Sequence, residues 1–148
     1  MSEIKTDKLT GTSTAGSILV TGEGNSNTTN LQQGLAKAWI NFNGAGTIAT
    51  RDSFNAASIA DNGTGQYTVT YSSAMGNTSY MTLASSGCNR NGNSYTSWCA
   101  ADTTSSGTGD TDAYTNKTSS ALQICNLTGA NTADDTIDIN LLVQGDLA

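Results

Sequence analysis

Hydrophobic residues in this chain form short runs that alternate with polar residues, and turn-forming residues separate the runs. Tyr67, Val69 and Tyr71 alternate with threonines, which is the period of a half-buried β-strand. The Asn-Gly pair within 61–65 comes just before this strand and predicts a hairpin. Besides a strand that begins at Ala38, the pattern predicts strands at 47–50, 53–61, 66–73, 79–85, 94–101, 119–127 and 135–144. Short strands at this spacing predict an all-β protein, an antiparallel β-sandwich of the jelly-roll or immunoglobulin-like type.

The first thirty residues have a different composition, with few large apolar side chains among many Thr, Ser, Gly and Asn residues. Such a segment buries too little surface to fold alone. We therefore predict an extended docking arm over 1–30, followed by a domain over 31–148. A disordered leader is the alternative. The residues expected to dock the arm or to join subunits are Ile4, Leu9, Ile18, Val20, Leu31, Leu35 and Trp39.

A short helix is predicted between the arm and the first strand, over residues 31–36. Asn30 is a suitable N-cap, and Leu31, Leu35 and Trp39 recur at helical spacing. From Ala38 onward the alternation fits a strand equally well. We therefore expect the helix to lead directly into the first strand.

The charge of the chain is strongly acidic, with six Lys and Arg residues against twelve Asp and Glu residues and a net charge of −6. Nucleic-acid binders present a basic patch, so this balance argues against that class. No run approaches the roughly 18 apolar residues of a membrane span, and the polar start MSEIKTDKLT lacks the pattern of a signal peptide. We expect synthesis in a cytosol and no membrane insertion.

The chain contains no histidine and no proline. The absence of histidine excludes Ser-His-Asp and Cys-His catalysis and removes the commonest metal ligand. Lysine is the remaining nitrogen base, and neither Lys8 nor Lys117 lies in an apolar run that would depress its pKa. We predict a protein that is not an enzyme and has no catalytic residue, cofactor or metal site.

Two groups of carboxylates are nevertheless candidates for a catalytic or metal-binding site. Asp110 and Asp112 lie in a Gly/Ser/Thr loop, and Asp134, Asp135 and Asp138 lie at the start of the last predicted strand. Paired carboxylates serve glycosidases, and carboxylates in flexible loops bind Ca²⁺. Turn formation is the simpler role for the first group. In the second, we expect Asp138 to point outward, on the face opposite Ile137 and Ile139.

The three cysteines are an odd number for a disulfide framework. A hairpin would bring Cys88 and Cys99 face to face, and a disulfide between them is left open. Cys125 lies in the apolar run ALQIC and is expected in the core. A structural zinc is disfavoured because three cysteines without histidine leave its usual four-ligand shell incomplete.

The segment 87–98, GCNRNGNSYTSW, is a candidate recognition loop. Aromatic side chains supply flat contact area, and Asn and Ser supply adaptable hydrogen bonds. The candidate ligand-contact residues are Asn89, Arg90, Asn91, Asn93, Tyr95 and Trp98. The alternative is an ordinary exposed loop with Trp98 packed in the core.

The block 21–75 contains TNLQQGLAKAW, then NFNG, RDSFN and DNGTGQYTV. It resembles a modular sequence of virion structural proteins of marine tailed bacteriophages, which are often described as tail fibres. The resemblance covers a little over a third of the chain and includes no catalytic residues. It implies a protein of the virion surface, made in the bacterial cytoplasm. It also implies a homotrimer, with Leu31, Leu35 and Trp39 expected at the subunit junction.

Three functions follow as expectations from the resemblance and the composition. The first is a short fibre or spike that is anchored by its N-terminal arm to tail or capsid proteins and contacts a glycan of the host surface. The second is a capsid decoration protein that stabilises the head. The third and most remote is an enzyme that degrades polysaccharide, which would need a cleft with two carboxylates.

Overall fold

The computed structural model describes residues 3–11, 18–24, 26–87, 117–127 and 132–148, and the backbone of 98–101. The chain divides into two compact units, Met1–Leu35 and Ala36–Ala148. We call them the N-terminal unit and the sheet unit and describe each by itself. Within the described residues, no helix has the length and apolar character needed to span a membrane.

The N-terminal unit contains two short strands and one turn of helix. β1 (Leu19–Thr21) pairs antiparallel with β2 (Thr28–Asn30), and α1 (Leu31–Gly34) follows directly. The run around residue 18 thus finds its partner strand within the predicted arm, and Leu9 lies in no strand. The predicted helix is present but ends at Gly34, because Leu35 has extended backbone angles.

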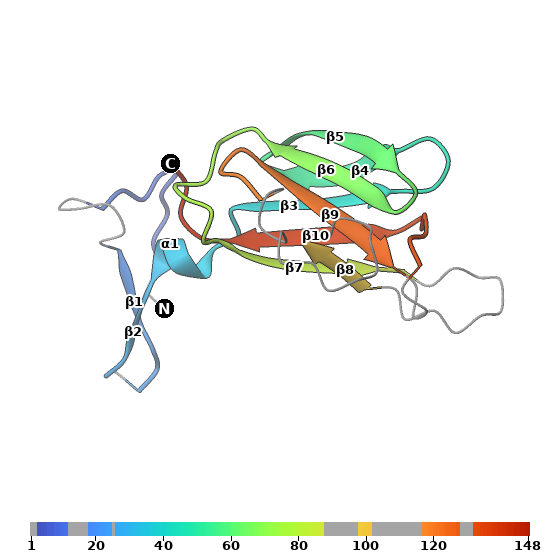
Figure 1. The fold of residues 1–148 in the computed structure, drawn as a ribbon. Coiled ribbons are helices and arrows are strands. Elements are labelled where there is room, and N and C mark those ends of the chain that lie inside the picture. Colours follow the sequence, from blue (N-terminus) through green and yellow to red (C-terminus); the bar gives the residue numbers. More distant parts are fainter. Residues whose placement is uncertain (1–2, 12–17, 25, 88–97, 102–116, 128–131) are drawn as a thin grey trace. The chain divides into compact units, whose positions relative to one another are not determined.

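The sheet unit confirms the prediction of an antiparallel, all-β protein. Its eight strands form one sheet in the order β4-β3-β10-β7-β8-β9-β6-β5, and every neighbouring pair is antiparallel (Figure 1). The narrower description as jelly-roll or immunoglobulin-like stays a prediction. The strands are β3 (Ala38–Asn43), β4 (Ala49–Phe54), β5 (Ala56–Gly63), β6 (Gln66–Tyr71), β7 (Met81–Ser86), β8 (Trp98–Ala101), β9 (Ala121–Leu127) and β10 (Ile139–Gln144).

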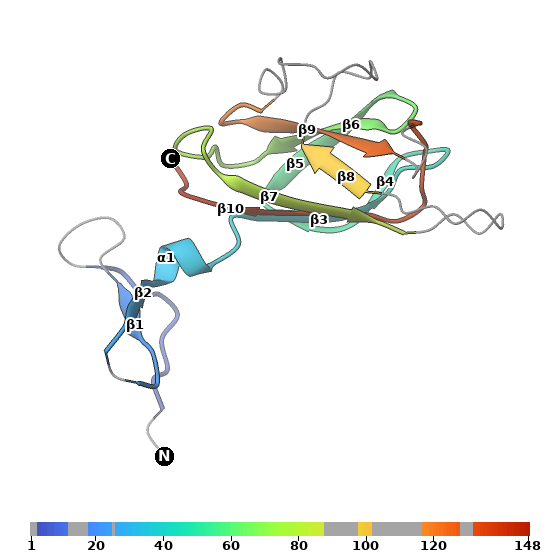
Figure 2. The same cartoon turned by 60° about the horizontal axis from the view of Figure 1, so that its bottom comes forward.

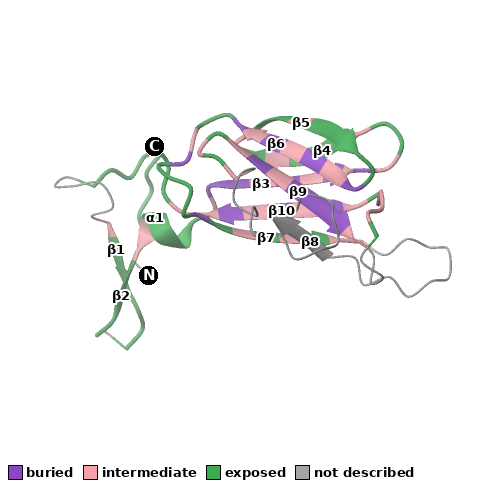
Figure 3. Ribbon diagram, in the orientation of Figure 1, coloured by how far each residue is buried: buried purple, intermediate pink, exposed green. Residues whose placement is uncertain are grey.

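The core lies between the two halves of this sheet. Alternate residues of β3, β6 and β10 are buried, which is the pattern of strands with one face inward (Figure 3). Phe42 of β3 meets Tyr67 of β6 edge-on, with ring centroids 5.1 Å apart, although these strands are not neighbours in the sheet. The sheet therefore folds over its own core, an arrangement consistent with a sandwich (Figure 2).

The turn between β5 and β6 forms where the Asn-Gly pair predicts it. β5 and β6 are paired along their length down to Gly63 and Gln66. Gly63 and Gly65 both have positive φ, at 130° and 66°, which glycine adopts without steric cost. The local sequence was sufficient here because the turn residues and the flanking alternation agree.

A corner at Asn55 divides the strand predicted over 53–61. Asn55 has a φ of 56°, a conformation that Asn tolerates better than most residues. Its amide Nδ2 donates to Lys37 O at 2.9 Å and to Ser73 O at 3.0 Å, while Oδ1 accepts from Ser73 N at 2.6 Å. These bonds fix the point where the chain leaves β4 at one end of the strand order and enters β5 at the other.

The prediction for the start of the last strand was wrong. β10 begins at Ile139, so Asp134 to Asp138 precede it, and Ile137 is exposed while Ile139 is fully buried. Ile137 and Ile139 therefore do not share a buried face. Asp138 instead forms an ion pair with Arg51, with Nη1 and Oδ1 3.0 Å apart. Arg51 is the extra residue of a bulge in β4, and its side chain reaches the carboxylate of Asp138 in the segment that precedes β10.

Two core tyrosines make stability sensitive to alkaline pH. Tyr71 and Tyr80 meet edge-on, and burial raises the pKa of both above its usual value. The folded state therefore holds these protons more tightly than the unfolded state does. The resulting stabilisation is complete below about pH 10 and is lost as the pH rises further.

We expect the phenolate absorbance of these two tyrosines to appear only as the protein unfolds above about pH 10. An alkaline titration followed by near-ultraviolet absorbance and circular dichroism tests this. Tyr71→Phe should make the fall in stability with pH less steep. Reversible ionisation of every tyrosine in the folded protein would contradict the prediction.

Candidate interaction surfaces

The predicted docking residues of the N-terminal unit are held by backbone contacts rather than by a core. Gly22 N donates to Asn27 O at 2.9 Å next to the β1–β2 pairing, and Leu31 N donates to Ile18 O at 2.8 Å. Asn30 caps α1, with its Oδ1 accepting from Gln33 N at 3.2 Å. This cap is the one that the sequence indicates.

Most of the predicted docking side chains lie in water. In the N-terminal unit the exposed ones are Ile4 at 90%, Leu9 at 61%, Leu35 at 53% and Val20 at 50%. Ile18 and Leu31 are partly buried. Trp39 does not join them in one helical stripe, because it lies in β3 of the sheet unit. The helical spacing of Leu31, Leu35 and Trp39 is interrupted when α1 ends at Gly34.

The candidate recognition loop falls mostly outside the described residues. Asn89, Arg90, Asn91, Asn93 and Tyr95 belong to 88–97, and only the backbone of Trp98 is described. The structure does place the two ends of the loop on neighbouring strands, where Ser85 of β7 pairs with Trp98 of β8. Gly87 N donates to Asp138 O at 2.8 Å and holds the first end next to the start of β10.

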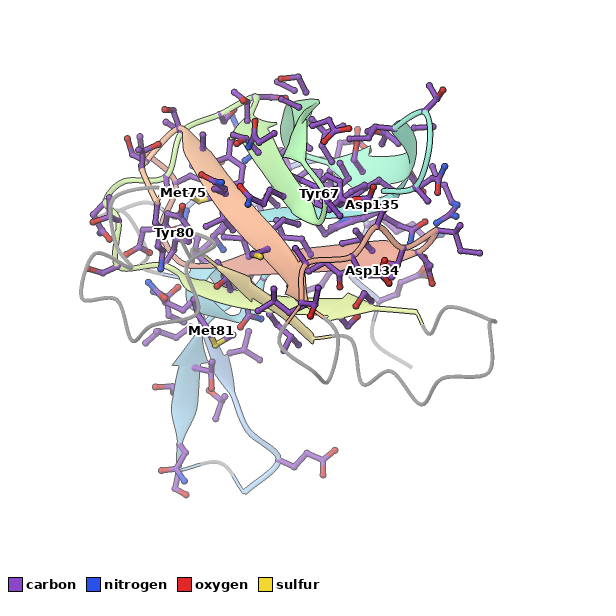
Figure 4. The ribbon with its side chains drawn as sticks, turned by 45° about the vertical axis from the view of Figure 1, so that its right-hand side comes forward. Tyr67, Met75, Tyr80, Met81, Asp134 and Asp135 are labelled. Atoms are coloured by element: carbon purple, nitrogen blue, oxygen red, sulfur yellow. The ribbon has the colours of Figure 1, made fainter. Side chains whose placement is uncertain are left out.

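Asp135 serves the turn between β5 and β6. Its Oδ1 accepts from Gly65 N at 2.7 Å and lies 2.9 Å from Tyr67 Oη (Figure 4). The same hydroxyl lies 2.9 Å from Gly44 O. The carboxylate therefore ties the turn, a core tyrosine and the loop after β3 together. This role of Asp135 is not evident in the sequence, because its partners are about 70 residues away along the chain.

Asn126 supports the same turn from β9. Its side chain is fully buried, and Nδ2 donates to Asp134 O at 2.6 Å. Its backbone N donates to Gly65 O at 2.7 Å, and its backbone O accepts from Asp134 N at 3.1 Å. Asp134 is thus held through its backbone, next to the carboxylate of Asp135.

Asp138 and Arg51 form a second polar cluster with Asn41. Asn41 Nδ2 donates to Asp138 Oδ1 at 2.6 Å and to Asn140 Oδ1 at 2.7 Å. Arg51 also donates to the carbonyl oxygen of Ile137. The ion pair is about half exposed, so its contribution to stability is small. Asp110 and Asp112 lie outside the described residues.

No group of three or more metal-ligating side chains is found in the described part of the chain. Cys125 is free and buried, as its apolar surroundings predict. Cys88 lies outside the described residues, as does the side chain of Cys99, so the possible disulfide stays open.

The pKa of Lys117 differs from the expectation that its sequence surroundings would not lower it. Burial lowers the pKa of this lysine, although no apolar run surrounds it in the sequence. Its Nζ lies 4.3 Å from the centre of the Tyr80 ring and donates to Tyr80 O. Tyr80 Oη in turn donates to Thr118 O at 2.9 Å. These contacts fasten the start of the 117–127 segment to the chain before β7.

Comparison with protein-family models, with curated protein sequences and with solved structures finds no match to this chain.

Proposed function

We propose that this protein is a non-enzymatic structural protein of a bacteriophage virion, a short surface fibre or spike. Its N-terminal unit anchors it to the particle, and the sheet unit faces the host. The observation that carries the proposal is the exposure of four apolar side chains of the N-terminal unit: Ile4, Leu9, Val20 and Leu35. The resemblance of the block 21–75 to phage virion proteins supports it.

The N-terminal unit has few interactions that could stabilise its structure. Two strands of three residues and a single helical turn are marginal structures in water. Segments of this kind become ordered when a partner surface covers their apolar side chains. Docking onto another virion protein would supply that cover for Ile4, Leu9 and Val20.

The non-enzymatic part of the proposal rests on the chemistry of the available side chains. The chain has no histidine. The carboxylates of Asp135 and Asp138 are bonded to Gly65 and Arg51 respectively, where they hold loops in place. A glycosidase needs two carboxylates that flank a substrate cleft.

Double replacement of Ile4 and Leu9 by serine tests the anchor. Both side chains are exposed, so the variant should fold as well as the wild-type chain. We expect its incorporation into virions to fall at least tenfold, because the apolar contact with the particle is removed. The matched control is Lys5→Ser with Lys8→Ser, which should be incorporated normally. Normal incorporation of the Ile4/Leu9 variant would overturn the anchoring role.

The position of the protein on the particle separates the fibre from the decoration protein. Imaging of virions that carry a tag after Ala148 should show density at the tail. Density spread over the head would contradict the fibre and favour a capsid decoration protein, in which the N-terminal unit contacts capsid subunits. Absence of the tag from purified virions would overturn both functions.

A further inference from the structure

One row of apolar side chains crosses the outer face of four strands. Trp39 of β3 lies opposite Leu142 of β10 on one side and Phe54 of β4 on the other. Leu142 in turn lies opposite Leu83 of β7. Directly opposed residues of antiparallel strands project from the same face. At about 4.8 Å between strands, the row is roughly 14 Å long.

This row faces away from the core. Ile40 and Leu141, the neighbours of Trp39 and Leu142 along the strands, are buried. Leu83 is 63% exposed and Phe54 is 50% exposed, and Trp39 and Leu142 are partly exposed. Met81, two residues from Leu83 on the same face of β7, is 55% exposed. We call these five side chains the outer apolar row.

The polar residues beside the row carry almost no net charge. Those that share the outer face on β3, β7 and β10 are uncharged: Asn41, Asn43, Ser85, Asn140 and Gln144. On the β4 side, the charge of Arg51 is balanced by that of Asp138. Asp52 is the remaining charged residue of β4. The net charge of −6 therefore arises mainly elsewhere in the chain.

This distribution favours a second copy of the chain as the partner. Two copies with a net charge of −6 each repel one another, so they can approach closely only through a face that lacks this charge. Amides donate and accept hydrogen bonds, so the flanking Asn41, Asn140 and Gln144 can pair with the same residues of another copy. A cationic partner would instead be recognised by clustered carboxylates.

The area of the row fits such a contact. Leu83, Met81 and Phe54 are at least half exposed, and Trp39 and Leu142 are less so, so that together they leave a few hundred Å² of apolar surface in water. A standard interface buries about 800 Å² on each partner, of which somewhat more than half is apolar. The outer apolar row can therefore form the centre of the interface, with the amides as its rim.

We propose that the outer face of β4, β3, β10 and β7 binds the same face of a second copy, so that two chains pair around a two-fold axis. This proposal retains Trp39 as a subunit contact. Its dimer contact on the sheet takes the place of the expected trimer junction, which combined Trp39 with Leu31 and Leu35. It concerns self-association alone and does not depend on the location of the protein on a virion.

Sedimentation equilibrium of the full chain across the micromolar range tests the proposal. We expect wild-type protein to sediment as a dimer and Leu83→Asp to raise the dissociation constant at least 100-fold, because the added carboxylate would be buried at the interface. Leu83 is exposed, so circular dichroism of the variant should match that of the wild-type chain. The control Ala60→Asp adds the same charge to exposed β5 and should leave the dimer intact.

The dependence of the dissociation constant on salt gives a second test, for which the direction of the change is predicted. Raising the ionic strength screens repulsion between two acidic chains, so the dissociation constant should fall as salt increases from about 50 to about 500 mM. A wild-type monomer or trimer, a dimer that survives Leu83→Asp, or a dimer that weakens with salt would overturn the proposal.

Discussion

Replacement of Gly65 by alanine is expected to lower the free energy of unfolding by about 3 kcal/mol or more. Gly65 has a φ of 66°, and a Cβ there would lie 2.6 Å from Asn126 O and 2.8 Å from Asp134 N. Both atoms belong to the backbone and cannot turn aside as a flexible side chain can. The substitution would therefore disturb the contacts of Asn126 and Asp135 that hold the β5–β6 turn.

Gly46→Ala is the matched control for this prediction. Gly46 has nearly the same φ, 67°, but a Cβ there would have no atom within 4 Å. Gly46→Ala should lower the free energy of unfolding only by the backbone strain, about 1 kcal/mol. Urea denaturation of both variants gives the comparison. Equal losses of stability would show that backbone strain alone, and not the close approach of the Asn126 and Asp134 backbones, determines the cost at Gly65.

Replacement of Phe42 by alanine is expected to remove about 3–5 kcal/mol of stability. Phe42 is fully buried and packs edge-on against Tyr67 across the core. Alanine would leave a cavity between the two halves of the folded sheet, lined on one side by that ring. Small domains are stable by only about 5–15 kcal/mol, so this single change should remove at least about a fifth of the total.

The second phenylalanine of the chain supplies the control. Phe54 lies on neighbouring β4 and is half exposed on the outer face. At a concentration where the chain is monomeric, Phe54→Ala should cost less than about 1 kcal/mol. At higher concentration the same variant should associate more weakly than the wild-type chain. A loss of stability for Phe42→Ala no larger than that for Phe54→Ala would contradict the assignment of the core.

Local sequence was enough for the strands whose signals were complete. Alternation predicted β6 around Val69, and the Asn-Gly pair predicted its hairpin with β5. It was not enough at Asn55, where a corner follows from hydrogen bonds to Lys37 and Ser73, each 18 residues away. The start of β10 was misplaced for a similar reason, because Arg51 draws Asp138 into a contact across 87 residues.

The candidate surfaces were predictable to an even smaller extent. Composition alone indicated the exposed apolar residues of the N-terminal unit, and Ile4 and Leu9 are indeed exposed. The outer apolar row was not predictable, since it depends on the register that places Leu83, Leu142 and Phe54 beside Trp39. Strand order and register are set by contacts between distant segments, and a single sequence does not display them.

The position of β10 in the strand order also governs when the sheet unit can form during synthesis. β10 is the eighth strand of the unit along the chain but lies between β3 and β7, so it supplies an edge to each of them. Until residues 139–144 have emerged, β3 and β7 have open edges and a half-covered core. Folding that depends on pairing between distant segments is slow, and strands with unpaired edges are prone to pair with other chains. A growing polypeptide of this protein therefore stays vulnerable to aggregation until β10 has emerged, and chaperones should act on the sheet unit mainly before that point.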